Sequence, residues 1–140
     1  MIETMREYQG IGLAAPQVHE GLRLFVAGMD GEEEPLPLVV LANPEITPVG
    51  DERVEDWEGC LSIPDMRGRV MRFEAIDVRA LDRDGRPIEM RMRAYPARVV
   101  QHETDHLDGV LFLDRMTSFE TLTFLEEFSR YWSETPVREE

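Results

Sequence analysis

Between residues 101 and 106 the chain reads Gln101-His102-Glu103-Thr104-Asp105-His106, a run that favours a helix with two histidines one turn apart. Side chains at positions i and i+4 of an α-helix lie on the same face. His102 and His106 can therefore bind one metal ion, and Glu103 would project beside it, close enough to act on a water molecule there. Histidine pairs with this spacing also occur in cores and on surfaces without any metal, so further donors are needed to decide between these interpretations.

The only cysteine of the chain lies in the segment Trp57-Glu58-Gly59-Cys60-Leu61-Ser62-Ile63-Pro64. A single thiol cannot form an internal disulfide, which fits a reducing compartment. A lone cysteine is often no more than a small buried apolar side chain. Here Cys60 can also be the third ligand, because one cysteine and two histidines with a fourth position open is a donor set of catalytic sites, whereas structural zinc sites usually have four protein ligands.

A segment rich in small residues precedes the histidine and cysteine segments. It reads Gly10-Ile11-Gly12-Leu13-Ala14-Ala15-Pro16-Gln17. Its glycines match the dinucleotide fingerprint G-x-G-x-x-A, but that fingerprint needs a strand before it and a helix after it. Here residues 1–8 are predicted to be the tail of a helix, and Pro16 leads towards a strand, so we reject the match. The segment is either an ordinary turn or a loop that lets a substrate backbone approach closely, with Gln17 as a polar donor.

Composition predicts one soluble globular domain spanning residues 1–140. The chain has 42% hydrophobic residues and a formal charge of −14, a balance that argues against a nucleic-acid-binding surface. No apolar run approaches the ~20 residues of a membrane span, and the first four residues do not resemble a signal peptide. We therefore expect a cytoplasmic protein without membrane or nucleic-acid partners. The acidic run Glu32–Glu34 is predicted to be a solvated loop.

Periodicity and turn signals predict an α+β fold. Strands are expected at residues 22–27 and at residues 38–42, the latter ending before Asn43-Pro44, and a hairpin at residues 76–80 and 88–92 around a turn at 82–85. A helix should run from Pro96 through the histidines to Gly109. Thr117 and Glu120 suggest a capping box for a last helix, whose inner face would carry Leu122, Leu125, Phe128 and Trp132. The expected architecture is mixed or antiparallel sheets packed around a central metal-binding helix, with a C-terminal helix.

Together, the three segments resemble the motifs of the peptide deformylase family, G-x-G-x-A-A-x-Q, E-G-C-L-S and Q-H-E-x-D-H. They occur in the family's order, at residues 10–17, 58–62 and 101–106, and the similarity extends to about Trp132. Family members normally begin with a strand-like stretch and most of a helix before the point where Met1 aligns. The chain is therefore expected to be an N-terminally short deformylase-like domain.

The resemblance implies that the protein removes the formyl group from formyl-methionine at the N-terminus of new polypeptides and releases formate. It implies that Cys60, His102 and His106 bind one divalent metal ion, typically Fe(2+), with zinc, nickel or cobalt in similar sites. Glu103 would take a proton from the water and deliver it to the departing amine. The backbone N–H of Leu61 and the side chain of Gln17 would stabilise the formyl oxygen.

Substrate contacts are implied for Ile11, Gly12, Val99 and Arg67. Val99 would line an apolar pocket for the methionine side chain, and Arg67 would lie near the peptide backbone, unless it forms a surface salt bridge instead. The expected partners are N-formylmethionyl peptides and nascent chains, bound by a monomer. Some deformylases dock on the ribosome through a basic C-terminal helix. The acidic end of this chain, with Glu126, Glu127, Glu134, Glu139 and Glu140, predicts no strong ribosome docking.

Two alternatives remain open at the level of sequence. H-E-x-x-H also marks zinc metallopeptidases, but these use a third His or Glu ligand downstream, and nothing comparable follows His106. Cys60 is thus the residue that discriminates between the two classes. The other alternative is a non-catalytic metal-binding relative that keeps the ligands without the activity.

Overall fold

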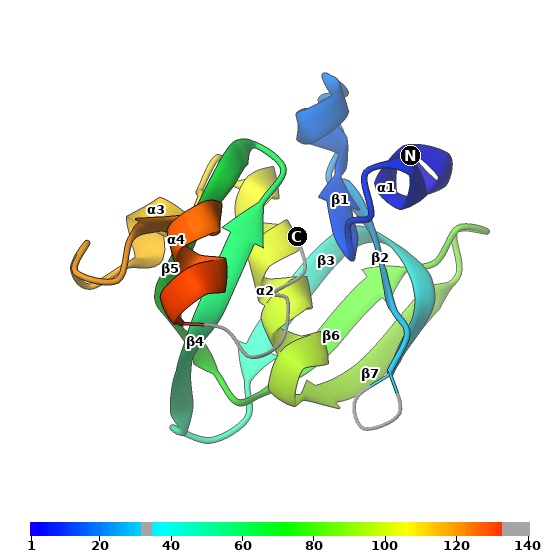
Figure 1. Cartoon of the computed structure of the whole chain (residues 1–140). Helices are drawn as coiled ribbons and strands as arrows, with labels where there is room; N and C mark the ends of the chain where they lie inside the picture. The colour runs from blue at the N-terminus through cyan, green and yellow to red at the C-terminus, as the bar shows by residue number, and fades with distance from the viewer. Residues whose placement is uncertain (32–34, 133–140) are drawn as a thin grey trace.

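The computed structural model describes residues 1–31 and 35–132. Within these residues two separate antiparallel sheets flank a central helix (Figure 1). The first sheet has the strand order β1-β2-β3-β6-β7, and its strands are β1 (Gly12–Ala14), β2 (Leu24–Met29), β3 (Leu36–Pro48), β6 (Ala75–Leu81) and β7 (Pro87–Arg93). The second has the order β4-β5-β8, with β4 (Arg53–Cys60), β5 (Ile63–Phe73) and β8 (Thr123–Phe124). The predicted acidic loop at Glu32–Glu34 lies outside the described residues.

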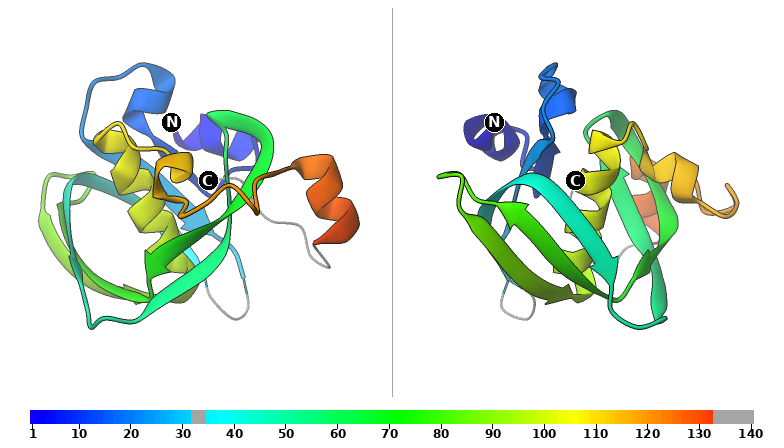
Figure 2. Two further views of the ribbon diagram at one scale, coloured as in Figure 1. Left: turned by 90° about the vertical axis from the view of Figure 1, so that its left-hand side faces the viewer. Right: turned by 180° about the vertical axis from the view of Figure 1, so that it is seen from behind.

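The helices are α1 (Ile2–Glu7), the central α2 (Ala94–Leu107), α3 (Phe112–Arg115) and α4 (Leu125–Tyr131), and a short 3-10 helix η1 spans Ala15–Val18. Figure 2 shows from two further sides that α2 crosses the space between the two sheets. The predicted α+β class is confirmed, with antiparallel pairing throughout the described strands. None of the helices in the described part of the chain has the length and apolar character that a membrane crossing requires.

An apolar core fixes α2 on the first sheet. Residues of both elements are almost fully buried there: Phe25, Leu41, Ile76 and Val78 from the sheet, and Ala97, Val99 and Val100 from the helix. Burying a side chain of this size contributes roughly 1.5–3 kcal/mol. The hydrophobic effect therefore holds the histidine-bearing helix against this sheet.

The strand predicted at residues 38–42 is longer than expected. We predicted its end before Asn43-Pro44, but β3 continues through both residues to Pro48. The pairing of β3 with β6 shifts register between Ala42 and Glu45, and Asn43 has a positive φ of 50°. Asparagine tolerates that conformation, and such a bulge accommodates a proline without a ladder hydrogen bond. The two residues bend the strand rather than end it.

The hairpin and the central helix agree with their predictions. β6 and β7 pair residue by residue from Ala75↔Arg93 to Leu81↔Pro87. In the turn, Asp82 Oδ1 accepts hydrogen bonds of 2.9 Å from the N–H groups of Asp84 and Arg86. Gly109, two residues beyond the end of α2, has a φ of 73°, as expected of a residue that follows a helix.

The C-terminal helix begins later than predicted. Instead of starting near Thr117, α4 starts at Leu125, and the residues before it form β8, which pairs with β5 at Arg67↔Thr123 and Met66↔Phe124. β-Branched and aromatic side chains suit a strand, and the open edge of β5 supplies the hydrogen-bond partners. Phe128 then holds α4 in place, with its ring edge-on to Trp57 at 4.8 Å between centroids.

The glycine-rich segment connects the first sheet with the tip of the β4–β5 hairpin. α1 precedes it, as predicted, and Met5 of α1 packs with Leu13 and Val26 in a small cluster on the face of the sheet opposite α2. Leu61, in the turn between β4 and β5, packs against the same cluster. The loop and the hairpin tip are therefore held together beside the end of α2 that bears the histidines.

Candidate active site

Three side chains with metal-binding atoms converge where β4 ends beside α2. Cys60 is the last residue of β4, and His102 and His106 lie one turn apart on α2. Their donor atoms all lie within 4.8 Å of one another, and all three residues are buried. Cys60 Sγ is 3.3 Å from His106 Nε2, and His106 Nε2 is 3.2 Å from His102 Nε2. All three predicted ligands belong to this cluster.

The distances from His106 Nε2 to the other two donor atoms match a single ion. Zinc-like ions bind cysteine sulfur at about 2.3 Å and histidine nitrogen at about 2.0–2.1 Å, so donors in tetrahedral arrangement stand about 3.3–3.6 Å apart. Burial, together with the charge of His102, lowers the pKa of His106 to about 4. A neutral imidazole has the free lone pair that metal binding requires. A thiolate with two imidazoles suits iron, zinc, cobalt or nickel, and the site is therefore a single-metal site of undefined metal identity.

A buried carboxylate orients the first histidine. Glu58 has no exposed surface, and its Oε1 lies 2.8 Å from Nδ1 of His102. When Nδ1 donates its proton to Glu58, Nε2 is left free to face the metal position. Burial would by itself raise the pKa of Glu58, but the hydrogen bond with His102 and the charge of Arg72 outweigh it and hold that pKa well below its ordinary value. Glu58 is therefore an ionised acceptor.

Two buried arginines hold this carboxylate. Arg72, on β5, donates from Nε and Nη2 to the two oxygens of Glu58, both at 2.9 Å. Arg98, on α2, donates from Nη1 to Glu58 Oε2 at 2.7 Å. Arg72 also reaches Asp105 Oδ2 on α2 at 2.6 Å, and the half-exposed Arg115 donates to the same carboxylate. The result is a continuous buried network from the histidine to the rim of the molecule.

The sequence patterns do not predict this network. The E-G-C-L-S motif contains Glu58 without indicating its role, and no motif includes Arg72 or Arg98. One signal was available for Arg98, which precedes His102 by four residues and so lies on the same helix face. The Arg72 position carries no local signal, because its partners lie on other elements.

Glu103 is fully buried beside the ligands. Its Oε1 lies 3.9 Å from His106 Nε2. A Cβ atom at Gly12 would stand only 2.7 Å from the carboxyl carbon of Glu103. The glycine at position 12 is therefore explained by the close approach of Glu103 to β1. This finding accounts for one residue of the glycine-rich segment. The segment is not an ordinary turn, because it forms strand β1 and then the short helix η1.

The two predicted oxyanion donors lie beside the cysteine. Gln17 Oε1 accepts a 2.9 Å hydrogen bond from the N–H of Ala14. Its Nε2 donates to Ser62 Oγ at 3.0 Å and lies 3.8 Å from Cys60 Sγ. Because the oxygen is held by the backbone, the amide nitrogen of Gln17 lies on the side of Ser62 and Cys60. Leu61 directly follows Cys60 in the turn, since Cys60 pairs with Ile63 across it.

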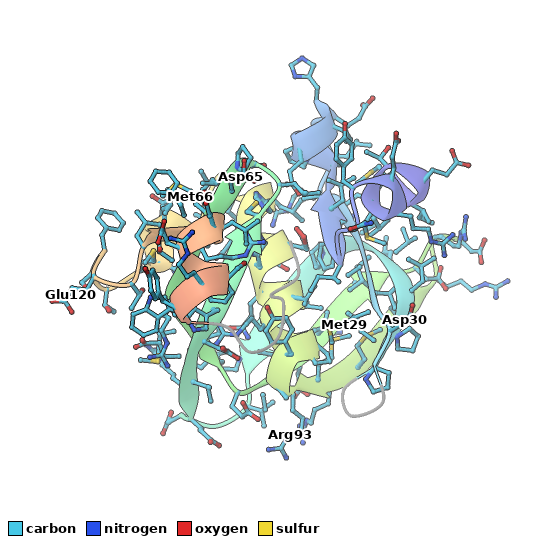
Figure 3. All side chains as sticks on the ribbon, in the orientation of Figure 1. Met29, Asp30, Asp65, Met66, Arg93 and Glu120 are labelled. Carbon is cyan, nitrogen blue, oxygen red and sulfur yellow. The ribbon has the colours of Figure 1, made fainter. Side chains whose placement is uncertain are left out.

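The predicted substrate residues are more buried than expected. Ile11 and Val99 belong to the main core, with exposed fractions of 3% and 0%. Ile11 also borders a groove of about 570 Å³ between α1 and the β2–β3 hairpin. The surface salt bridge considered for Arg67 is wrong, because Arg67 is only 2% exposed. It packs on Gly59, where a Cβ would lie 2.6 Å from the guanidinium carbon. Asp65 and Met66, just before it, are labelled near the start of β5 in Figure 3.

The fold and the site together define a class of enzyme. A buried Cys-His-His cluster shared by a strand and a helix, with a buried glutamate next to the first histidine, is the arrangement of a single-metal hydrolase.

Comparison with known proteins gives the family. A family model described as polypeptide deformylase matches residues 1–121. Peptide deformylase 1 of Prochlorococcus marinus (strain MIT 9313) is 44% identical over 131 residues, which cover 89% of this chain and 68% of that protein. The peptide deformylase of Dictyoglomus thermophilum is 52% identical over 115 residues, which cover 82% of this chain and 71% of that protein.

The fold agrees with these sequences. The crystal structure of a class I type b peptide deformylase from Acinetobacter baumannii matches with a TM-score of 0.79 and 42% identity, covering 83% of this chain and 76% of that one. A probable peptide deformylase from Synechococcus phage S-SSM7 matches with a TM-score of 0.76 and 43% identity, covering 83% and 78%. The chain belongs to the polypeptide deformylase family, and the metallopeptidase alternative is set aside.

Proposed function

We propose that this protein hydrolyses the N-formyl group of formyl-methionine at the start of newly made polypeptides, giving formate and a free amine. The observation that carries the proposal is the convergence of Cys60, His102, His106, Glu103 and Gln17 around one buried point. One relative, a deformylase of Acinetobacter baumannii with a TM-score of 0.78 and 40% identity, was solved with Met-Ala-Ser bound. That tripeptide has the form of a deformylated chain start, which supports the same substrate class here.

Cys60, His102 and His106 would hold one divalent ion, for which we propose Fe(2+), with zinc, nickel or cobalt as chemically suitable substitutes. Bound there, the ion would supply Lewis acidity and lower the pKa of a nearby water molecule. Glu58 supports this site by accepting the Nδ1 proton of His102. The anionic thiolate of Cys60 offsets part of the positive charge, so more of the catalytic work falls to Glu103 than in a site with three neutral ligands.

Glu103 would be the general base and then the general acid. It would take the proton of the attacking water and afterwards deliver that proton to the nitrogen of the breaking formamide bond. The water oxygen thus becomes part of formate, and the amine leaves with the bonding electrons and the proton. Burial of Glu103 and the contact with Gly12 favour this role, because they restrict the carboxylate to one position.

Gln17 and Leu61 would stabilise the negative charge that develops on the formyl oxygen. The side-chain N–H of Gln17 and the backbone N–H of Leu61 flank Cys60, so both can point to an oxygen beside the metal position. Removing one oxyanion donor from a hydrolase costs about 3–4 kcal/mol of transition-state stabilisation. The hydrogen bond from Ala14 to Gln17 preorganises one of these donors.

For the substrate, we propose that Ile11 and Gly12 approach the peptide backbone and that Arg67 supports the opposite wall from β5. Val99 has no exposed surface, so its contribution would be to close the bottom of the methionine pocket. We further propose a monomeric, cytoplasmic protein with a single domain over residues 1–140 that acts on nascent chains without strong ribosome docking. Part of the acidic end on which this last point rests, including Glu134, Glu139 and Glu140, lies outside the described residues.

The test is formate release from formyl-Met-Ala-Ser by protein loaded with Fe(2+) without oxygen. Glu103→Gln should lose at least 100-fold in kcat while still binding the metal, because only the proton carrier is removed. The matched control is Glu126→Gln, which alters an exposed carboxylate on α4 and should leave the rate unchanged. A folded, metal-loaded parent that releases no formate would overturn the proposal and favour the non-catalytic metal-binding relative.

A further inference from the structure

The metal ligands come from two elements that belong to different parts of the fold. The histidines are on α2, which the apolar core fixes to the first sheet. Cys60 is on β4, whose sheet shares no strand pairing with the first one in the described residues. The separation between the cysteine sulfur and the histidine nitrogens therefore depends on how the β4–β5 hairpin is held against α2.

Arg98 makes the densest connection between the two. Its Nη2 donates to the carbonyl oxygen of Val54 on β4 at 2.7 Å. Its Nη1 donates to the carbonyl oxygen of Val70 on β5 at 2.8 Å, and also to Glu58 Oε2 at 2.7 Å. Arg98 is only 4% exposed, and its guanidinium binds the main chain of both strands and the side chain of Glu58 on β4.

These contacts close a ring through the metal site. Arg98 lies one helical turn before His102, and Glu58 lies two residues before Cys60. Glu58 binds both Arg98 and His102. A displacement of the hairpin along the helix would have to break the Arg98 bonds or the bond between Glu58 and His102. Hydrophobic burial defines such a position less sharply than hydrogen bonds do, because it has no directional preference.

We propose that Arg98 is a positioning residue that sets the distance of Cys60 from the histidine pair and so the geometry and affinity of the metal site. The inference rests on the metal site of the proposed function. Arg72 and Gln101 also connect the hairpin to α2, Arg72 through Asp105 and Gln101 through the backbone of Phe73. Arg98 differs from them because it joins the carbonyls of both strands to the carboxylate that binds His102. A lysine cannot replace it, since one ammonium lacks the planar fork that reaches several acceptors at once.

The test uses cobalt(II) as the metal, because its thiolate absorption bands report the bond to Cys60. Two variants are compared with the parent, Arg98→Met, which removes every donor, and Arg98→Lys, which keeps a positive charge beside Glu58. We expect Arg98→Met to weaken cobalt binding by 10–100-fold, to shift or weaken the thiolate band, and to lower kcat more than it raises KM. Arg98→Lys should recover part of the affinity but not the parent spectrum.

The matched control is Tyr95→Phe. Tyr95 is on the same helix, and its hydroxyl donates to the carbonyl oxygen of Trp57 on β4 at 3.2 Å, so the variant removes a helix–hairpin hydrogen bond that does not involve Glu58. It should bind cobalt like the parent. If Arg98→Met does not fold, the decision passes to Arg98→Lys. A folded Arg98 variant with cobalt affinity within twofold of the parent and an unchanged thiolate band would overturn the inference. Weakened cobalt binding in a protein whose parent releases no formate would support it, while the proposed function would have failed.

Discussion

The two sides of α2 hold the rest of the molecule by opposite means. Towards the five-stranded sheet the helix presents Ala97 and Val100, which pack among Phe25, Leu41 and Ile76. Towards the β4–β5 hairpin it presents polar side chains instead: Arg98 binds Val54, Glu58 and Val70, Gln101 binds the backbone of Phe73, and Asp105 binds Arg72. One helix therefore has an apolar side and a hydrogen-bonded side.

The two sides contribute differently to the stability of the fold and to the geometry of the metal site. Apolar burial supplies most of the favourable free energy of folding and has no directional preference. A buried ion-pair network adds little net stability compared with apolar packing, but its hydrogen bonds have narrow ranges of distance and angle. The polar side of α2 is also the side on which Cys60 must meet the histidines. We infer that the apolar side keeps the protein folded and that the polar side sets the shape of the metal site.

The largest loss of stability should follow from removing Glu58, the carboxylate at the centre of the polar side. Glu58→Ala leaves the buried charges of Arg72 and Arg98 without their shared partner, which costs about 3–5 kcal/mol, and it removes the acceptor for His102. Urea unfolding of the metal-free variant measures the loss. The control is Glu55→Ala, whose carboxylate is 38% exposed and 3.4 Å from Arg69, and which should cost at most about 1 kcal/mol. A loss below that level for Glu58→Ala would contradict the account of the network.

A change on the apolar side should reduce stability without altering the metal site. Leu41→Ala removes a fully buried side chain from the core and should destabilise by about 3 kcal/mol. The folded variant should keep the cobalt affinity of the parent. The exposed Leu22, at 57%, provides the control, since Leu22→Ala should change stability by less than about 0.5 kcal/mol. A tenfold loss of metal affinity in Leu41→Ala would show that the two sides are not separable.

The polar side should also make the metal-free protein sensitive to acid. Burial lowers the pKa of His106 to about 4, whereas an unfolded histidine titrates near 6.5. Between those values the unfolded chain binds the additional proton, so stability falls as the pH drops from about 6.5 to about 4, by roughly 2–3 kcal/mol. Urea unfolding at a series of pH values measures this slope. It should be reduced in His106→Gln, and an unchanged slope in that variant would assign the effect to other groups.

The smallest change in stability is expected for a substitution at the start of α2. Ala94, the first residue of the helix, has a positive φ of 58°, a conformation that costs a residue with a Cβ about 1–2 kcal/mol. Ala94→Gly should raise stability by about 0.5–1 kcal/mol, because glycine adopts this φ freely but loses more entropy on folding. Thermal unfolding measures the gain, and the cobalt spectrum should not change. A destabilised variant would mean that the methyl group of Ala94 makes contacts worth more than the strain.

Much of the site was predictable from residues close together in the chain. The spacing of His102 and His106 indicates a shared helix face, and three short motifs brought in Cys60 and Gln17 through the family resemblance. The β6–β7 hairpin followed from alternation and an Asp-Gly turn. These features depend on the regular periods of helices and strands, which the order of residues records directly.

The predictions that differ from the structure have one cause, which is contact between segments far apart in the chain. β3 continues through Asn43-Pro44 because β6 lies beside it, and residues 123–124 form a strand because the edge of β5 is open to them. The burial of Arg67 and the network around Glu58 likewise depend on contacts among β4, β5 and α2. In each case the same residues would be a turn, a helix start or a solvated charge if their partners were elsewhere. Local pattern determined which chemistry the chain carries, and the packing of α2 between two sheets determined how that chemistry is held, because directional bonds form only after folding brings their two ends together.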